Sequence, residues 1–277
     1  MRKFSLELFC RIIGIGSASG LFFQNNSLYL ISDNSNVLYN YDIPSKNLTK
    51  TELSQARPLE NIPKAYKPDF EAMTLYGNDL YLFGSGSTDK RNTAQKVNTA
   101  TTSTSKIDMA ELYDAMQSFG QIDKANFNIE AVVNDGADWY FFNRGNGPKG
   151  QNAIFTLSGD IFGQEFQMLH NEFKLPKING ASASFTDAVK VKGKLYFLAA
   201  AEKSNSTYHD GEVAGTLIGC IDIDSMEIDW TQVISSKNKF EGITLYAEDA
   251  KNLTFLLCED TDSQVEASDI YKLTIDK

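Results

Sequence analysis

Histidine, cysteine and long apolar runs are scarce in this chain of 277 residues. It has two histidines and three cysteines, and the cysteines, Cys10, Cys220 and Cys258, lie far apart. An odd number of widely spaced cysteines argues against a disulfide framework or a zinc knuckle, so each thiol is expected to be a small buried apolar group. No apolar run approaches the roughly 18 residues of a membrane helix. We therefore expect no membrane partner.

Basic residues are also in short supply, with 26 lysines and arginines against 36 acids and a net charge of −10. This charge disfavours nucleic acid and anionic membranes and favours cations, neutral ligands or cationic ligands as partners. The N-terminal segment lacks a signal-peptide core because Glu7 and Arg11 interrupt its apolar residues. As written, the sequence predicts a cytoplasmic monomer, and an extracytoplasmic protein if a signal peptide has been removed.

Motifs of nucleophilic catalysis are missing as well. The sequence has no Gly-x-Ser-x-Gly elbow and no supported Cys/His pair, so serine-type and cysteine-type catalysis are poorly supported. The GSGS stretch at residues 84–87 could form a backbone cradle for an anion, or it could be the flexible start of a loop. It lacks the lysine and the following helix of a P-loop. No organic cofactor is expected.

What the sequence does contain is a pattern repeated five times. Each unit has a short apolar strand, a turn rich in Gly, Asn or Asp, and a second strand rich in aromatic or β-branched residues, as in a β-hairpin. The units begin SGLFFQ, EAMTLY, EAVVND, DAVKVK and EGITLY. Their aligned positions, separated by 52, 59, 57 and 54 residues, are Ser19, Glu71, Glu130, Asp187 and Glu241.

Four antiparallel strands repeated at about 50 residues are typical of a β-propeller blade. A third strand is recognisable in four units, and a fourth in the first and fourth units (NLTKTEL and EIDWTQVI). The last unit ends after three strands, whereas the chain begins with an orphan strand. If residues 4–10 pair with residues 268–275, the ring closes without an open sheet edge. The sequence thus predicts an all-β, five-bladed propeller of four-stranded antiparallel blades, forming one domain over residues 1–277.

Helical patterning is confined to KIDMAELYDAMQSF at residues 106–119. Asp108 suits an N-cap, and the apolar positions Ile107, Met109, Leu112 and Met116 have helical spacing. We expect one short amphipathic helix inserted in the second blade. The polar stretch before it, residues 89–105, is predicted to be a long mobile loop.

Acidic residues open the inner strands of the predicted ring, so they should converge near its axis. One interpretation is a hard cation, most simply Ca²⁺, bound by Glu71, Glu130 and Glu241, with Asp187 and the Ser19 hydroxyl completing the shell. The alternative is that water, backbone N–H groups and Arg144 hold the acids as structural links between blades.

Loops that follow the second strands should surround these acids as a rim on the same face of the ring. Arg144 could bind an anionic ligand group, or it could form an ion pair with Glu130 of its own blade. His209, next to Asp210, could be a general base or an ordinary solvated side chain. The side chains expected at this mouth as ligand-binding residues are Arg144, Ser85, Ser87, His209, Glu202 and Glu259.

Taken in order, the pieces SGLFFQNNSLYLISDNS, DFEAMTLYGNDLYLFGSGST, NIEAVV, FFNRGNG, FTDAVKV and KFEGITL resemble a family of bacterial propeller proteins of unassigned function. A looser resemblance is to five-bladed calcium-activated nucleotidases, the apyrases. That second resemblance implies an axial Ca²⁺ near Ser19, Glu71, Glu130 and Glu241. The chain departs from the nucleotidase pattern at Asp187 and lacks the extended motifs between blades that hold the nucleotide.

Three functions are compatible with these features. The first is a metal-dependent hydrolase of phosphate-type esters. The second is a non-catalytic module that binds a small molecule or a protein at the channel mouth, because propeller rings support many functions. The third is a lactonase-like or esterase-like enzyme whose acids would also be metal ligands.

Overall fold

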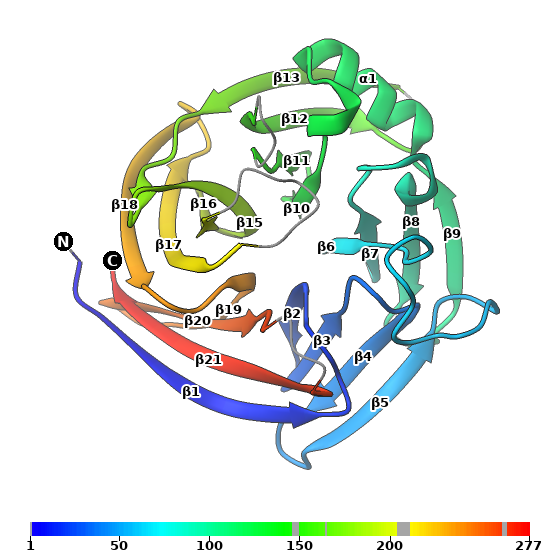
Figure 1. The fold of residues 1–277 in the computed structure, drawn as a ribbon, viewed down its shortest axis with the longest axis horizontal. Helices are drawn as coiled ribbons and strands as arrows, with labels where there is room; N and C mark the ends of the chain where they lie inside the picture. The colour runs from blue at the N-terminus through cyan, green and yellow to red at the C-terminus, as the bar shows by residue number, and fades with distance from the viewer. Residues whose placement is uncertain (1, 146–149, 164, 204–210, 262–264) are drawn as a thin grey trace.

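The computed structural model of the chain describes residues 2–145, 150–163, 165–203, 211–261 and 265–277. Its strands form five antiparallel sheets around a common axis, which Figure 1 shows from one end of the ring. The predicted all-β, five-bladed propeller is confirmed. In each blade the strands run outward from the axis as a meander.

The first three blades follow the order of the chain. Blade one comprises β2 (Gly20–Gln24), β3 (Ser27–Ile31), β4 (Val37–Asp42) and β5 (Asn47–Glu52). Blade two comprises β6 (Phe70–Tyr76), β7 (Asp79–Gly84), β8 (Thr93–Asn98) and β9 (Thr104–Asp108). Blade three comprises β10 (Ile129–Asn134), β11 (Asp138–Asn143), β12 (Asn152–Asp160) and β13 (Glu165–Phe173).

The last two blades each have a special feature. Blade four adds a short strand β14 (Lys177–Ile178) to β15 (Ala181–Val191), β16 (Lys194–Glu202), β17 (Val213–Asp222) and β18 (Glu227–Ser235). Blade five takes β19 (Phe240–Glu248), β20 (Asn252–Glu259) and β21 (Ala267–Asp276) from the end of the chain and β1 (Phe4–Ile13) from its beginning.

Ring closure occurs through β1 and β21, which lie side by side in Figure 1. Their antiparallel register places Phe4 opposite Ile275 and Ile13 opposite Ala267. The pairing predicted for the N-terminal strand is therefore confirmed, and it extends three residues beyond the predicted segment. Because β1 covers β21, the edge that β21 would otherwise expose is paired within the chain.

The apolar core is divided among the interfaces between neighbouring blades. Five separate clusters of buried side chains occur among the described residues, one at each interface around the ring. Between blades two and three, for example, the rings of Phe83 and Phe141 meet edge to face with centroids 5.4 Å apart. Such aromatic pairs add to the free energy of burying apolar area, which fixes each blade against the next.

Blade two corrects one expectation from the sequence. Residues 89–105 were expected to be a long loop, but they contain β8 and the start of β9. These strands are rich in Thr, Gln, Lys and Ser, and β9 has no fully buried residue, so the apolar alternation that signals a strand is missing. Outer strands of a blade face water and can be polar.

The single α-helix among the described residues, α1 (Ala110–Gly120), follows β9 and lies outside the ring between blades two and three (Figure 1). Its N-cap position is Met109, not Asp108, although the Asp108 carboxylate accepts a hydrogen bond from the Ala110 N–H at 2.9 Å. Leu112, Tyr113 and Met116 bury its apolar face against the core between these blades. No helix in the described ranges is long and apolar enough to cross a membrane.

Candidate functional site

Each of three inner strands contains a β-bulge at its start, and the extra residue is a glutamate. The pairing register slips between Phe70 and Ala72, between Ile129 and Ala131, and between Phe240 and Gly242. The residues left without a partner at these slips are Glu71, Glu130 and Glu241. A bulge removes one residue from the pleat and re-aims its side chain. It explains why a strand with core-like alternation can begin with a carboxylate, and all three glutamates line the axial cavity.

Blade four has the same bulge, but with a different residue. The slip lies between Phe185 and Asp187, so Thr186 holds the position equivalent to the three glutamates. Sequence alignment had assigned Asp187 to this position and was displaced by one residue. In a strand, a displacement of one residue moves a side chain to the opposite face.

Asp187 accordingly has another environment. It does not line the cavity, and its carboxylate accepts hydrogen bonds from the N–H groups of Ala188 at 2.8 Å and Ile243 at 2.7 Å. Burial raises the pKa of Asp187 well above its ordinary value. Its contacts link blade four to blade five, which matches the structural alternative considered for the inner-strand acids.

Ser19 and Thr186 perform one shared task in their blades. The Ser19 hydroxyl donates a hydrogen bond to the Phe70 carbonyl at 2.6 Å, and the Thr186 hydroxyl donates one to the Phe240 carbonyl at 2.8 Å. In both cases the acceptor is the first residue of the next blade's inner strand. Ser19 does not line the cavity.

The cavity itself opens on the ring axis and has a volume of about 1780 Å³. The starts of the inner strands and the segments that follow the second strands supply its walls. The described residues that line it without being fully exposed include seven acids and four bases. The acids are Asp33, Asp69, Glu71, Glu130, Glu202, Glu241 and Asp260, and the bases are Lys67, Arg91, Arg144 and Lys239. We call these eleven residues the floor of the mouth.

One side of the floor is organised by two cations. The Arg144 guanidinium lies 3.3 Å from a Glu130 oxygen, 3.1 Å from Glu202 and 3.9 Å from Glu241. The Lys239 ammonium lies 2.9 Å from Glu241, 3.6 Å from Glu202 and 3.5 Å from Asp260. Arg144 thus forms the ion pair with Glu130 that was one of its two expected roles.

Burial and the charges on this side of the floor shift the pKa values of Glu130, Glu241 and Arg144. Burial raises the pKa of Glu130 above its ordinary value, and it raises the pKa of Glu241 to about 8, although nearby cations oppose both shifts. Burial alone would lower the pKa of Arg144, but the charges of Glu130, Glu241 and Glu202 raise it overall. Each cation therefore remains charged and serves several carboxylates at once.

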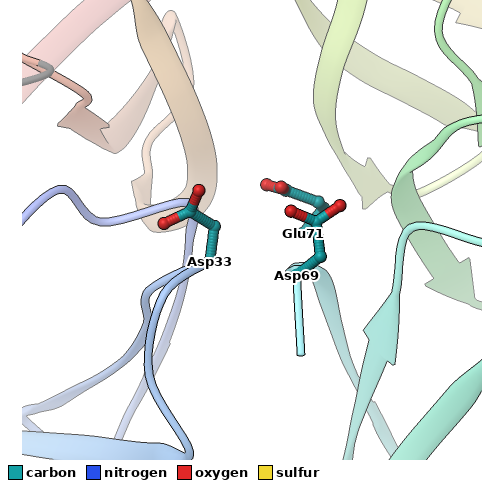
Figure 2. A group of neighbouring side chains, drawn as sticks. All are labelled: Asp33, Asp69 and Glu71. Atoms are coloured by element: carbon teal, nitrogen blue, oxygen red, sulfur yellow. The ribbon is translucent and has the colours of Figure 1, made fainter. Parts of the chain in front are cut away.

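The other side of the floor gathers Asp33, Asp69 and Glu71, which Figure 2 shows with Asp33 on a segment separate from the other two. One carboxylate oxygen from each lies within 4.8 Å of the others. The Lys67 ammonium contacts Asp33 and lies 2.7 Å from Asp69, and Arg91 lies 2.7 Å from the other Asp69 oxygen. Asp69 also accepts a hydrogen bond from the Ser85 hydroxyl.

In the described part of the chain, Glu71 is the floor carboxylate without an ion-pair partner. Among the described residues, no Lys, Arg or His nitrogen lies within 4.0 Å of its oxygens, whereas each of the other six floor acids has such a neighbour. Burial, followed by the negative charges of Asp69, Glu130 and Asp33, raises the pKa of Glu71 well above its ordinary value. The charge of Lys67 opposes this shift, but burial and the neighbouring acids outweigh it, so ionising Glu71 is unfavourable unless a cation binds beside it.

The residues expected at the rim divide into three groups. Arg144, Glu202 and Ser87 line the cavity, and buried Ser85 supports it from behind through Asp69. Glu259 accepts a hydrogen bond from the Asn238 amide at 2.8 Å and does not line the cavity. His209 lies outside the described residues.

Several floor residues were not found from the sequence, namely Asp33, Lys67, Asp69, Arg91, Lys239 and Asp260. The sequence contained one signal for Asp69 and Lys239, which is their position two residues before a bulge. In each of the four bulged blades, the residue at this position lines the cavity. These residues are Asp69, Asn128, Ser184 and Lys239. The N–H groups of Ser85, Arg144 and Asp260 donate to the carbonyls of Asp69, Asn128 and Lys239, at 3.0, 2.8 and 3.0 Å. This repeated hydrogen bond aligns the two wall segments in three blades.

Comparison with known proteins gives the fold a context. A model of a protein family described as a family of unknown function (DUF6929) matches residues 14–275. No curated protein matches the sequence. The expected membership of a propeller family without an assigned function is confirmed, whereas the resemblance to calcium-activated nucleotidases is not shown by these comparisons.

Three solved structures share the fold at very low sequence identity. Glutaminyl cyclase of Myxococcus xanthus has 9% identity and a TM-score of 0.56, over 98% of this chain and 97% of that one. The allergen Mala s 1 of Malassezia sympodialis has 10% identity and a TM-score of 0.55, over 95% of each chain. A luciferin-regenerating enzyme has 9% identity and a TM-score of 0.51, over 99% of this chain and 97% of that one. At such identities the likeness concerns the fold alone.

Proposed function

Because the chain belongs to DUF6929, a family of unknown function, its role has to be inferred from its own residues, and we propose that the axial mouth binds a divalent cation through Asp33, Asp69 and Glu71. The observation that carries this proposal is the Glu71 carboxylate, which has no ion-pair partner among the described residues and has two further carboxylates within reach. Ca²⁺ is the ion that suits such a site best.

Ligand geometry supports a hard cation. Ca²⁺ binds oxygen ligands at about 2.3–2.6 Å, so two ligands of one ion are at most about 5 Å apart. The three carboxylate oxygens meet this limit, since all lie within 4.8 Å of one another. They come from rigid positions, because Glu71 occupies the bulge and Asp69 is held by Arg91 and Ser85. Water and backbone carbonyls can supply the remaining ligands that Ca²⁺ requires.

The choice of ligands follows from which carboxylate oxygens meet. We retain Glu71 from the ligands expected on sequence grounds and replace Glu130 and Glu241 with Asp33 and Asp69. Both pairs of acids have cationic partners, but the oxygens of Asp33 and Asp69 meet that of Glu71 within 4.8 Å. A divalent cation would offset the negative charges of the neighbouring acids, which, after burial, raise the pKa of the Glu71 carboxyl.

A bound cation would define the chemistry of the mouth. In a hydrolase, it would polarise an oxygen of a phosphate-type ester or a lactone and activate a water molecule. In a non-catalytic module, it would bridge the protein and an oxygen-rich ligand. A panel of phosphatase, nucleotidase and lactonase assays, each with and without EDTA, separates these roles. Cation-loaded protein that is inactive in all three assays would identify the binding module.

The cation site itself is tested by thermal unfolding of EDTA-treated, metal-free protein. Added Ca²⁺ should raise the Tm of the wild-type protein by mass action, since only the folded ring brings the three carboxylates together. Glu71→Gln should abolish this rise. Glu172→Gln is the matched control, because it removes one charge from an exposed residue of the same cavity. A wild-type Tm that does not respond to Ca²⁺ would overturn the proposal.

A further inference from the structure

Blade four carries an addition at the mouth that no other blade has among the described residues. Its inner strand β15 begins at Ala181, five residues before the bulge at Thr186, whereas β6 begins one residue before Glu71. The extra length pairs with β14, with Lys177 opposite Ser182 and Ile178 opposite Ala181. We call residues 174–184, which contain this small hairpin, the lip.

The lip is a fixed structure. Its two-residue turn, Asn179-Gly180, has positive φ values of 49° and 86°, as a tight hairpin turn requires. Ile178 is only 3% exposed and packs into the core between blades three and four. The Asn179 side-chain amide donates a hydrogen bond to the Ala214 carbonyl of β17 at 2.9 Å. These contacts hold the lip at the wall of the mouth.

Charge is distributed unevenly between the outer and inner parts of the mouth. Among the described residues, the exposed charged side chains that line the cavity are Lys64, Lys174, Lys177, Lys203 and Glu172, and Lys203 is paired with Glu212 at 2.9 Å. Lysine therefore predominates at the described part of the rim, although the chain carries a net charge of −10 and the floor beneath is acidic. Lys174 and Lys177 both belong to the lip, and the exposed Ser182 lies opposite Lys177. Lysine ammonium groups and a serine hydroxyl are donors suited to an anionic oxygen group.

We propose that the lip binds the anionic group, a phosphate or a carboxylate, of the ligand that enters the mouth. Lys174 and Lys177 supply the positive charge, and the other end of the ligand points toward the floor. The statement that one ligand contacts both the lip and the bound cation rests on the proposed function. The contacts between the lip and the anionic group do not require the cation. The cavity, at about 1780 Å³, exceeds the roughly 300–1,000 Å³ of common small-molecule pockets. A ligand that reaches from rim to floor is therefore an extended one.

The test is calorimetric titration with inorganic phosphate, and separately with acetate, in EDTA buffer. Wild-type protein should bind at least one of these anions saturably, and which of them binds identifies the anionic group. Lys174→Gln/Lys177→Gln should weaken binding about tenfold or more, as expected when charge-assisted contacts are lost. The control is Lys46→Gln/Lys251→Gln, which makes the same charge change in turns at the opposite end of the ring. It should bind as the wild type does.

Two results would overturn the inference. One is a wild-type protein that binds neither anion saturably, and the other is a lip variant that binds as tightly as the control. Glu71→Gln separates this inference from the cation site, because it should lose Ca²⁺ binding and keep anion binding in EDTA. Anion binding that depends on the lip, in a protein that ignores Ca²⁺, would refute the cation site and leave the lip assignment standing.

Discussion

The Lys67 ammonium lies 2.7 Å from an Asp69 oxygen and also contacts Asp33, so the chain places its own cation on two of the three carboxylates of the candidate metal site. A divalent cation has to compete with this side chain. The charges of Asp69, Glu71 and Asp33 raise the pKa of Lys67 although burial lowers it, so the competitor stays charged at neutral pH.

Replacing this internal cation should strengthen metal binding. Lys67→Gln removes a positive charge from two proposed ligands, so we expect Ca²⁺ affinity, measured by calorimetry, to rise about tenfold or more. Stability without Ca²⁺ should fall, because Asp33 loses its ion-pair partner. Lys90→Gln is the control, since Lys90 is an exposed residue of the same segment as Arg91. Unchanged affinity in Lys67→Gln would mean that the ion binds elsewhere.

Glu71 should also make cation binding depend on pH. Its pKa is raised well above the ordinary value of 4.5 in the folded protein. At a pH between 4.5 and the pKa of Glu71 in the folded protein, the folded state keeps the Glu71 proton, whereas the unfolded state has released it. The stability that this group contributes is therefore fully present below pH 4.5 and is lost as the pH rises through the folded pKa.

Two measurements test this direction of the pH dependence. In metal-free protein, the free energy of unfolding should decline over that pH window, and Glu71→Gln should make the decline shallower. In the wild type, Ca²⁺ affinity should increase over the same window, because the cation binds the ionised carboxylate. A Ca²⁺ affinity that is constant from mildly acidic to mildly alkaline pH would contradict the role given to Glu71.

Arg144 should prove to be a structural cation. Its guanidinium is shared by Glu130, Glu202 and Glu241, and Arg144→Met would leave these buried acids short of a partner. Breaking a buried ion pair in this way costs about 3–5 kcal/mol, which denaturant unfolding can measure. The double variant Arg144→Met/Glu130→Gln should recover part of this loss. If Arg144→Met instead abolished phosphate binding and left stability intact, the anion-binding role would be correct.

Asp187 offers a test of the register in blade four. Its carboxylate accepts N–H groups from two blades, and the amide of Asp187→Asn can accept through its single oxygen only. A buried N–H left without an acceptor should lower the free energy of unfolding by about 1–3 kcal/mol. Ca²⁺ affinity should not change, because Asp187 does not line the cavity. Asp224→Asn, at an exposed turn, is the neutral control. A loss of Ca²⁺ binding in Asp187→Asn would restore Asp187 to the site.

The repeat was visible in the sequence wherever both strands of an inner hairpin are buried, because burial forces apolar residues into a regular pattern. The strand pattern could not be recognised at β8 and β9, because exposure of the outer strands to water allows Thr, Ser and Lys there. It also failed by one residue at Thr186, because Asp187 stands before an alanine just as Glu71 and Glu130 do. A bulge is a property of pairing between two strands, and one strand's sequence does not reveal it.

The floor acids at the starts of three inner strands, Glu71, Glu130 and Glu241, could be predicted, but the partners of the floor acids could not. Lys67 and Lys239 come before the strands, and Asp33 and Arg91 come from connecting segments with no repeated sequence. Only the closed ring brings Lys67 to Asp33, Arg91 to Asp69 and Lys239 to Glu241 within ion-pair distance. Whether an acidic ring is neutralised from inside or left open to a ligand is therefore decided by tertiary structure.

The pairing of β1 with β21 also determines when the molecule can be completed during synthesis. Of the strands of the ring, β1 is synthesised before all the others, and its partner β21 is synthesised after all the others. Blades one to four can assemble as they emerge, while β1 waits with an unpaired edge. Contacts of such long sequence separation form late and leave a nascent chain open to wrong associations. A growing chain held by a chaperone through β1 would be protected until β21 had been synthesised.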